Sequence, residues 1–414
     1  MLKTMPATIT NLSAREILDS RGMPTVEVTL ETEHASYTAS VPSGASVGSS
    51  EAHELRDGGE RFGGKGVLKA VGNAEGEIAA ALRGQTFDQK SLDARLRELD
   101  GTADKSRLGA NALLGVSLAF ARAAAGEAGM PLYAYFGALA GYEKFTLPQL
   151  CFNVLNGGKH ADSGLAVQEF LLVPKAPSGA QQIELAAAVI AQLRTLLVEQ
   201  GHSTSVGDEG GFAARLGTSE KALDMLVEAI ARANAVGKVS IALDAAASDF
   251  YKDGSYMLDG GRTRTAPELA AWYEGLLEKY PLVSIEDPFN EDDWDSFAAF
   301  TARVGAHARV VGDDLLTTNP IRIEEAGQKG AVNTVLIKPN QIGTVSEALE
   351  ASLLARSKGW ALFASHRSGE TTDTAIADFA AGLSCEYLKA GSLCRGERVC
   401  KYNRIMEIEA ELAR

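Results

Sequence analysis

Short apolar segments recur through the second half of the chain, and each is followed by a residue that can bind a metal ion or move a proton. Roughly 20–40 residues separate successive segments, which is enough for one helix and two loops. The segments and the residues after them are 239–243 with Asp244, 282–285 with Glu286, 309–312 with Asp313, 334–337 with Lys338, 361–365 with His366 and 386–388 with Lys389. This alternation predicts a parallel sheet, and the number of repeats favours closure into a barrel. Because the carboxyl ends of barrel strands converge on one mouth, we expect these side chains to form an active site.

The first part of the chain follows a different pattern. Residues 25–32 and 36–41 have strand character around a short polar turn, which predicts a hairpin. The other expected elements are helices at 65–82, 91–99, 111–126 and 180–200, strands at 150–155 and 166–173, and a linker at 137–148. We therefore predict an α/β protein of two domains. An α+β capping domain, residues 1–136, precedes a (β/α)8 TIM-like barrel with an irregular first part, residues 137–414.

Composition limits the partners of the protein. Of its 414 residues, 45% are hydrophobic and 23% are charged, an ordinary globular balance, and the formal net charge is −14. That charge argues against nucleic acid or an anionic membrane as the principal partner. An anionic small substrate remains compatible with it, because a few cations or bound divalent ions set the local sign at a mouth.

Neither a secretory signal nor a membrane span is expected. Residues 1–11 lack an apolar core, and the most apolar helices, at 113–125 and 183–198, are interrupted by charged side chains. The four cysteines form no CxxC pair; they are Cys151, Cys385, Cys394 and Cys400. Reduced structural thiols are therefore expected, which favours a cytoplasmic protein.

Three of the residues after the strands are acidic and suit a magnesium site. Asp244, Glu286 and Asp313 offer hard oxygen ligands, and Mg²⁺ prefers a few carboxylates with open positions for water or substrate. Any one of them is more easily explained as a helix N-cap. Three in succession at matching depth favour a metal site.

Two lysines after strands suggest a proton-abstracting base. Lys338 alone is most simply a side chain that extends to solvent, but Lys389 is expected to face it across the mouth. Two ammonium groups ~4 Å apart repel by roughly 4 kcal/mol at an effective dielectric of 20. This is worth about 3 pKa units, so one lysine is expected to be neutral near pH 7 and the other to hold an anionic substrate.

The segment VGDEGG at 206–211 holds two acids between glycines. It is either a surface turn or a rigid support for Glu209 as a general acid with a raised pKa. His160 and Glu169 lie in nearby segments and are, singly, weak signals.

The segment SHRSGE at 365–370 carries donors suited to a phosphate group, and no GxSxG motif supports a serine hydrolase. The small-residue loop at 42–48 is either a spacer or a closing loop in which Ser46 offers a metal ligand.

Taken together, these segments resemble the enolase family along nearly the whole chain. The matching stretches are DSRGMPTVEV, PSGASVGSSEAHELRDGG, NGGKHA, VQEF, VGDEGGF, ALDAAASDFY, SIEDPFNEDDW, VGDDLLTTNP, IKPNQIGT, SHRSGETTD and KAGSLCRGERVCKYN. The resemblance implies a capping domain before a barrel, and reversible dehydration of 2-phosphoglycerate to phosphoenolpyruvate with two Mg²⁺ ions. It also implies a cytoplasmic, homodimeric or larger enzyme of glycolysis and gluconeogenesis.

The resemblance further implies a role for each matching residue. It implies Lys338 as the base that removes the C2 proton, and Glu209, with Glu169 beside it, as the acid that assists departure of the C3 hydroxyl. The implied metal ligands are Asp244, Glu286, Asp313 and, for the second ion, Ser46, and the implied substrate-binding residues are His160, His366, Arg367, Ser368 and Lys389. The Lys-plus-Mg²⁺ arrangement is the general pattern of enolase-superfamily sites.

The chain departs from the family pattern at four places. Val47 replaces a threonine in the loop, Ala390 replaces a threonine after Lys389, and residues 212–215 differ from the usual sequence beside Glu209. Glu407 replaces an arginine in a helix that contacts the partner subunit in the family. Two other functions stay open at this point. One is an enolase-like synthase that joins a different phosphonate or phosphate acid to a three-carbon unit, and the other is a non-catalytic scaffold.

Overall fold

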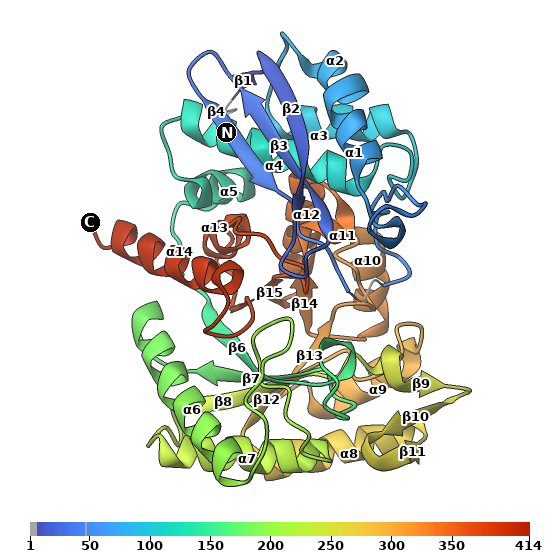
Figure 1. The fold of residues 1–414 in the computed structure, drawn as a ribbon, viewed down its shortest axis with the longest axis vertical. Helices are drawn as coiled ribbons and strands as arrows, with labels where there is room; N and C mark the ends of the chain where they lie inside the picture. The colour runs from blue at the N-terminus through green and yellow to red at the C-terminus, as the bar shows by residue number, and fades with distance from the viewer. Residues whose placement is uncertain (1–5, 46–47) are drawn as a thin grey trace.

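The computed structural model of the protein describes residues 6–45 and 48–414, and its centre is a closed barrel of eight strands (Figure 1). The strands, in chain order, are β6 (Gln149–Asn156), β7 (Glu169–Pro174), β8 (Val239–Asp244), β12 (Leu282–Glu286), β13 (Arg309–Gly312), β14 (Thr334–Ile337), β15 (Ala361–Ser365) and β16 (Tyr387–Lys389). Around the barrel they follow the order β12-β13-β14-β15-β16-β6-β7-β8. The predicted alternation of strand and helix is therefore confirmed.

The barrel begins irregularly, as predicted. Strand β7 runs antiparallel to both β6 and β8, whereas all other neighbours in the barrel are parallel. The register aligns Asp244 with Glu169 on one side and with Glu286 on the other. Strand pairing alone thus brings three carboxylates to the same height at the barrel mouth, before any side-chain contact is considered.

Helices cover the outside of the barrel because each presents an apolar face to it. In α7, for example, the Thr218 hydroxyl accepts from the backbone N–H of Lys221 at the start, and the buried residues recur at helical spacing. The helices are α6 (Gly179–Glu199), α7 (Ser219–Arg232), α8 (Ala266–Lys279), α9 (Trp294–Val304), α10 (Pro320–Lys329), α11 (Pro339–Ile342), α12 (Val345–Ser357), α13 (Ala375–Gly382) and α14 (Gly396–Leu412). A small sheet and short helical turns complete this part: β9 (Tyr251–Lys252), β10 (Ser255–Leu258), β11 (Arg262–Arg264), η3 (Gly158–His160), η4 (Ala247–Phe250) and η5 (Asp259–Gly261).

The N-terminal region packs a three-stranded antiparallel sheet on helix α4 (Ala110–Glu127), which is almost entirely buried. Gly115 of α4 permits the close contact, since a Cβ atom there would lie 2.6 Å from Val28 Cγ2. The sheet consists of β2 (Asn11–Leu18), β3 (Pro24–Glu31) and β4 (Ser36–Ser40). The remaining elements are β1 (Ala7–Thr8), η1 (Arg61–Gly64), α1 (Leu68–Asn73), η2 (Ala74–Ile78), α2 (Ala79–Leu82), β5 (Thr86–Phe87), α3 (Gln89–Asp100) and α5 (Leu132–Ala140).

Two of the longer elements in this region were not expected from the sequence. Strand β2 extends the predicted hairpin, but Leu12 is its only buried residue, so hydrophobic alternation does not mark it. Pairing with β3 along its whole length holds it in place. Helix α5 occupies the beginning of the expected linker, because it packs on α13 through contacts such as Phe136 with Phe379.

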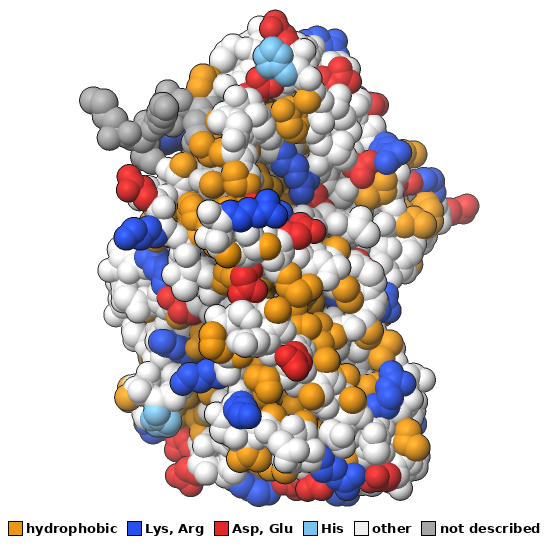
Figure 2. Space-filling model, turned by 90° about the vertical axis from the view of Figure 1, so that its left-hand side faces the viewer, with side chains coloured by type: hydrophobic (Ala, Val, Ile, Leu, Met, Phe, Trp, Pro, Cys, Tyr) orange, Lys and Arg blue, Asp and Glu red, His pale blue; other side chains and the backbone are white. Residues whose placement is uncertain are grey.

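The N-terminal region lies over the carboxyl ends of the barrel strands (Figure 1). Ser43 and Gly369 exchange two backbone hydrogen bonds of 2.8 Å, and the Ser20 N–H donates to the Glu370 carbonyl. Among the described residues, no helix combines the length and apolar character that crossing a bilayer requires. On the face shown in Figure 2, basic and acidic side chains are interspersed with hydrophobic ones and no continuous basic stripe is seen.

Candidate active site

The residues expected at the strand ends line one cavity at the barrel mouth. Its volume is about 420 Å³, and its walls come from both halves of the barrel. The lining residues are His160, Gln168, Glu169, Glu209, Asp244, Ala246, Asp287, Asp313, Asp314, Lys338, Ser365, His366, Arg367, Ser368 and Lys389. Glu286 lies immediately beside this set, because its Oε1 accepts from Lys389 Nζ at 2.8 Å. Ser46 and Val47 lie outside the described residues.

Lys389 reaches across the barrel into a group of carboxylates. Its Nζ lies 2.8 Å from Glu286 Oε1, 3.1 Å from Asp244 Oδ2 and 3.5 Å from Glu169 Oε2. All four side chains are buried. Burial lowers the pKa of Lys389, but attraction to these carboxylates outweighs it and raises the pKa well above its ordinary value. Lys389 is therefore a permanent cation in this arrangement.

Lys338 is also charged here, which corrects the expectation of a neutral lysine. Its Nζ donates to Asp313 Oδ2, and Gln341 Nε2 donates to Asp313 Oδ1 at 2.8 Å. Burial and the positive charge of Lys389 lower the pKa of Lys338, but attraction to Asp313 outweighs them, so the pKa lies above its ordinary value. The expectation considered repulsion between the lysines alone, whereas each lysine has its own carboxylate partners.

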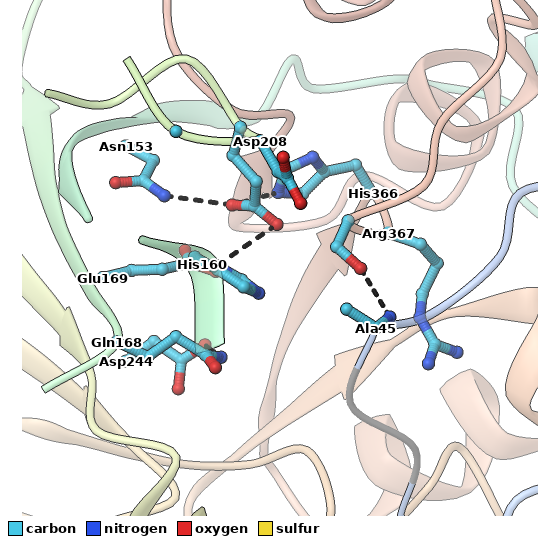
Figure 3. A network of polar contacts seen from close by, with 12 residues as sticks. Ala45, Asn153, His160, Gln168, Glu169, Asp208, Asp244, His366 and Arg367 are labelled. Atoms are coloured by element: carbon cyan, nitrogen blue, oxygen red, sulfur yellow. Dashed lines mark hydrogen bonds and ion pairs between the residues drawn. The ribbon is translucent and has the colours of Figure 1, made fainter. Parts of the chain in front are cut away.

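The acids Glu169 and Glu209 form a buried pair beside two histidines. Figure 3 shows Glu169 together with His160 and His366. His160 Nδ1 lies 3.5 Å from Glu169 Oε1 and 3.6 Å from Glu209 Oε1. Glu209 Oε2 accepts from Asn153 Nδ2 at 3.0 Å and lies 3.4 Å from His366 Nε2. Burial and repulsion by Glu209 raise the pKa of Glu169 well above its ordinary value. Two like charges in such a dry pair share one proton.

The proton of this pair resides on Glu169, which corrects a second expectation. Burial raises the pKa of Glu209, but His160, His366 and Arg398 counteract it, and the net direction is well below the ordinary value. The raised pKa expected for Glu209 therefore belongs to its neighbour. The VGDEGG turn does hold Glu209 rigidly, since the Glu209 carbonyl accepts from the Ser392 N–H at 2.9 Å.

The state of His366 predicts how stability depends on pH. Burial lowers the pKa of His366 from 6.5 to about 3. Between these values the unfolded chain binds a proton that the folded chain does not, so His366 makes folding less favourable as the pH falls. We expect the unfolding free energy of the wild type, minus that of His366→Gln, to fall by up to about 1.4 kcal/mol per pH unit below pH 6.5. Urea unfolding at several pH values measures it.

The matched control for this measurement is His307→Gln, which removes an exposed histidine in the loop between α9 and β13. The difference between wild type and this control is expected to stay flat over the same pH range. An equally flat difference for His366→Gln would show that His366 gains its proton in the folded protein.

Arg367 and Ser368 join the barrel to the N-terminal region. Arg367 donates to Glu51 at 2.9 and 3.1 Å and to Asn340 Oδ1 at 3.1 Å. Ser368 Oγ accepts from the Ala45 N–H at 2.6 Å (Figure 3). The donors expected to bind a phosphate are thus gathered at the cavity wall, next to the loop that contains Ser46.

The acidic residues of the cavity fit a hard divalent cation. Asp244, Glu286 and Asp313 are 4%, 2% and 7% exposed, and lysine ammonium groups balance their charge here. In the described residues, Asp313 forms a group with Asp287 and Asp314 in which one carboxylate oxygen of each lies within 4.8 Å of the others, whereas Asp244 and Glu286 belong to no such group. These ligand atoms are all oxygen, the type that Mg²⁺ prefers.

Several site residues were not expected from the sequence. Asp314 follows Asp313 directly, and Gln341 lies one helical turn after Lys338, so both had a local signal. Glu51 and Arg398 had none, because they are distant in sequence and only folding brings them to Arg367 and His366. Of the departures from the family pattern, Arg215 pairs with Asp162 at the surface.

Comparison with known proteins decides the family. Residues 9–136 match the model of the enolase N-terminal domain, and residues 144–414 match that of the enolase C-terminal TIM barrel domain. The chain belongs to the enolase family. It is 52% identical over 416 residues to Enolase 1 of Lactococcus lactis subsp. cremoris, covering 99% of this chain and 98% of the relative. It is 51% identical over 418 residues to Enolase 2 of Lactococcus lactis subsp. lactis, with the same coverage.

A distant organism provides a relative of similar closeness. Enolase 1 of Entamoeba histolytica is 48% identical over 420 residues, covering 98% of this chain and 96% of the relative. Enolases are hydro-lyases, and this enolase accordingly dehydrates 2-phosphoglycerate to phosphoenolpyruvate. The small-molecule substrate and the barrel fold predicted from the sequence are confirmed.

Proposed function

We propose that this enolase acts through Lys338 as base and the Glu169–Glu209 pair as acid, on opposite sides of the substrate. The observation that carries the proposal is the order of the barrel strands. Lys338 follows β14 and Glu169 begins β7, and these two strands are four places apart in a ring of eight, in either direction. A substrate held between them presents its C2 proton to one side and its C3 hydroxyl to the other, which suits elimination across the C2–C3 bond.

Lys338 accepts the C2 proton on Nζ. To do so it must first be neutral, and its pairing with Asp313 opposes this. Asp313 and its neighbours would hold a metal ion, whose charge would weaken the attraction of Asp313 for Lys338 and favour the neutral amine, while Lys389 repels any added charge. The residue next to a metal-binding carboxylate thus becomes a base only when the site is loaded, which couples proton removal to substrate binding.

The acid pair gives its shared proton to the departing C3 hydroxyl. Glu169 holds this proton, and Glu209 lies within reach of the same imidazole, His160. After the hydroxyl leaves as water, both carboxyls are ionised and the cationic Lys389, 3.5 Å from Glu169, balances part of their charge. His366, Arg367 and Ser368 are proposed to orient the anionic groups of the substrate.

The proposed ligands of Mg²⁺ are Asp244, Glu286 and Asp313, with Ser46 for a second ion on the basis of the family resemblance. When bound, the ions supply positive charge that stabilises the dianion formed as the C2 proton leaves. Two ions per site agree with the excess of carboxyl groups over lysines in the cavity.

The domain boundaries and the cellular setting of the enzyme are also proposed. The family models end at 136 and resume at 144, which agrees with a capping domain of residues 1–136 and a barrel of residues 137–414. We also propose a cytoplasmic homodimer active in glycolysis and gluconeogenesis, with neither nucleic acid nor membrane as partner. The Glu407 side chain is 63% exposed and pairs with Arg404 of its own helix. The mass of the protein in solution tests whether it forms a dimer with glutamate at this position.

Removal of metal tests the proposal. Wild type treated with EDTA is expected to lose activity on 2-phosphoglycerate, followed by enol absorbance, and to regain it with Mg²⁺. Glu286→Gln is expected to need at least about 10-fold more Mg²⁺, since one ligand is lost. Asp224→Asn, which changes an exposed carboxyl on α7, is the matched control and should respond as the wild type does.

Two results contradict the proposal. Full activity after EDTA treatment would rule out a metal requirement. Inert wild type in the presence of Mg²⁺ would favour the synthase or the scaffold, and a panel of other phosphonate and phosphate acids then separates these two.

A further inference from the structure

Arg398, in the first turn of α14, is completely buried directly behind the active site. Its guanidinium is surrounded by acceptors from two segments that carry site residues. Nη1 donates to His366 Nδ1 and to the Arg367 carbonyl, both at 2.6 Å. Nη2 donates to the Ser368 carbonyl at 2.6 Å and to the Asp208 carbonyl at 3.1 Å. The substrate-facing side chains of these segments point the other way, into the cavity.

The backbone is shaped to hold Arg398 in this position. Gly391 has a φ of +80°, and a Cβ atom there would lie 2.7 Å from Arg398 Cδ and 2.7 Å from the Glu209 carbonyl oxygen. Only glycine adopts this conformation and leaves this space without strain. The segment after Lys389 is thus folded around the arginine stem and the Glu209 turn together.

The contact with His366 determines which ring nitrogen carries the proton. A guanidinium has donors only and keeps its charge in proteins, so His366 Nδ1 must be the acceptor. A neutral imidazole then has its proton on Nε2. That nitrogen lies 3.4 Å from Glu209 Oε2, whose other donor is Asn153. Glu209 therefore faces two fixed N–H groups.

This arrangement separates the two acids of the active site. Fixed donors favour the ionised form of Glu209. We propose that Arg398 is a positioning residue that holds His366 in its Nε2–H form and thereby directs an N–H at Glu209 Oε2. Burial of His366 agrees with a neutral ring, since it lowers the pKa of that imidazole to about 3. The catalytic consequence rests on the proposed role of the acid pair, whereas the tautomer does not.

The tautomer can be observed without any turnover. The chain has six histidines, so selective ¹⁵N-histidine labelling and long-range ¹H–¹⁵N correlation give few signals, and the spectrum of His366→Gln identifies those of His366. In the wild type we expect a protonated Nε2 and an unprotonated Nδ1. In Arg398→Met we expect the Nδ1–H form to appear. A wild-type His366 with its proton on Nδ1, or a doubly protonated ring, at neutral pH would overturn the proposal.

Kinetics distinguish positioning from general support of the fold. We expect Arg398→Met to lower kcat at least 10-fold with KM changed less than 3-fold, and to displace the pH profile of kcat. Arg404→Gln is the matched control. It removes another arginine of α14, together with its ion pair to Asp378 of α13, and Arg404 does not contact His366. It should leave both the His366 signals and the pH profile unchanged. An identical shift in both variants would mean that α14 acts only as a support.

If Arg398→Met does not fold, Arg398→Lys provides the second test. A lysine keeps the positive charge but cannot bridge His366 Nδ1 and three carbonyls as the guanidinium does. It is expected to give a mixture of His366 tautomers and an intermediate kcat. The link between tautomer and rate would be contradicted if Arg398→Lys folds and has a reduced kcat while His366 remains entirely in the Nε2–H form. If the wild type shows the Nε2–H ring but does not dehydrate 2-phosphoglycerate, the proposed function is refuted and the proposal for the tautomer still stands.

Discussion

Replacing Lys338 with alanine is expected to lower kcat on 2-phosphoglycerate by about 10²–10⁴-fold, the usual contribution of a general base. Because the lysine acts on the reacting carbon and other residues bind the anionic groups, KM should change little. The same variant is expected to stop exchange of the C2 hydrogen of 2-phosphoglycerate with deuterated solvent, which ¹H NMR follows directly. Enol absorbance gives the overall rate.

Lys329→Ala is the control, since Lys329 is an exposed lysine at the end of α10 and should leave both measurements unchanged. C2 exchange at the wild-type rate in Lys338→Ala would transfer the role of base to another residue. Calorimetry must accompany the kinetics, because the substitution also removes the partner of buried Asp313.

Glutamine in place of Glu209 or Glu169 is expected to lower the dehydration rate by about 10²–10⁴-fold while leaving C2 exchange in place. The reason is that, in the proposed mechanism, proton removal at C2 uses Lys338, whereas loss of the C3 hydroxyl needs the proton of the acid pair. The two variants should thus resemble each other in rate and differ from Lys338→Ala in exchange. Exchange and enol absorbance measured on the same samples separate the two half-steps.

Stability is expected to distinguish the two glutamates. A neutral amide imitates protonated Glu169, so Glu169→Gln should unfold close to the wild-type temperature. Glu209→Gln loses hydrogen bonds to an ionised group, which are worth about 1.5–3 kcal/mol, and should unfold at a lower temperature. Glu228→Gln, an exposed change on α7, serves as the control. The reverse order of stabilities would place the proton on Glu209.

Much of the site was predictable because the carboxyl ends of barrel strands meet at one mouth. Asp244, Glu286 and Lys389 end strands in the structure as predicted, and most of the residues in the runs before Asp244 and Glu286 are buried. Strand β2 could not be predicted in this way, because almost none of its side chains is buried. Helix α5 begins directly after Pro131, and a proline is as common shortly after the end of one helix as at the start of the next.

The charge states could not be predicted from the sequence. Two lysines at a mouth suggest repulsion, but the structure gives Lys338 and Lys389 separate carboxylate partners that raise both pKa values. Similarly, a rigid turn suggested a raised pKa for Glu209, whereas the histidines beside it reverse the direction. A pKa depends on every charge within a few ångströms, and most of those charges come from other strands.

The sequence by itself determined the family and the barrel and predicted the reacting groups, because these follow from local runs of residues whose spacing survives folding. Only the tertiary structure decided which acid holds the proton, which lysines are charged and that Arg398 lies behind His366. These properties arise from contacts between residues far apart in the chain, over distances of 2.6–3.6 Å. At that range a change of one charged partner reverses the direction of a pKa shift, and the sequence pattern does not show which residue that partner is.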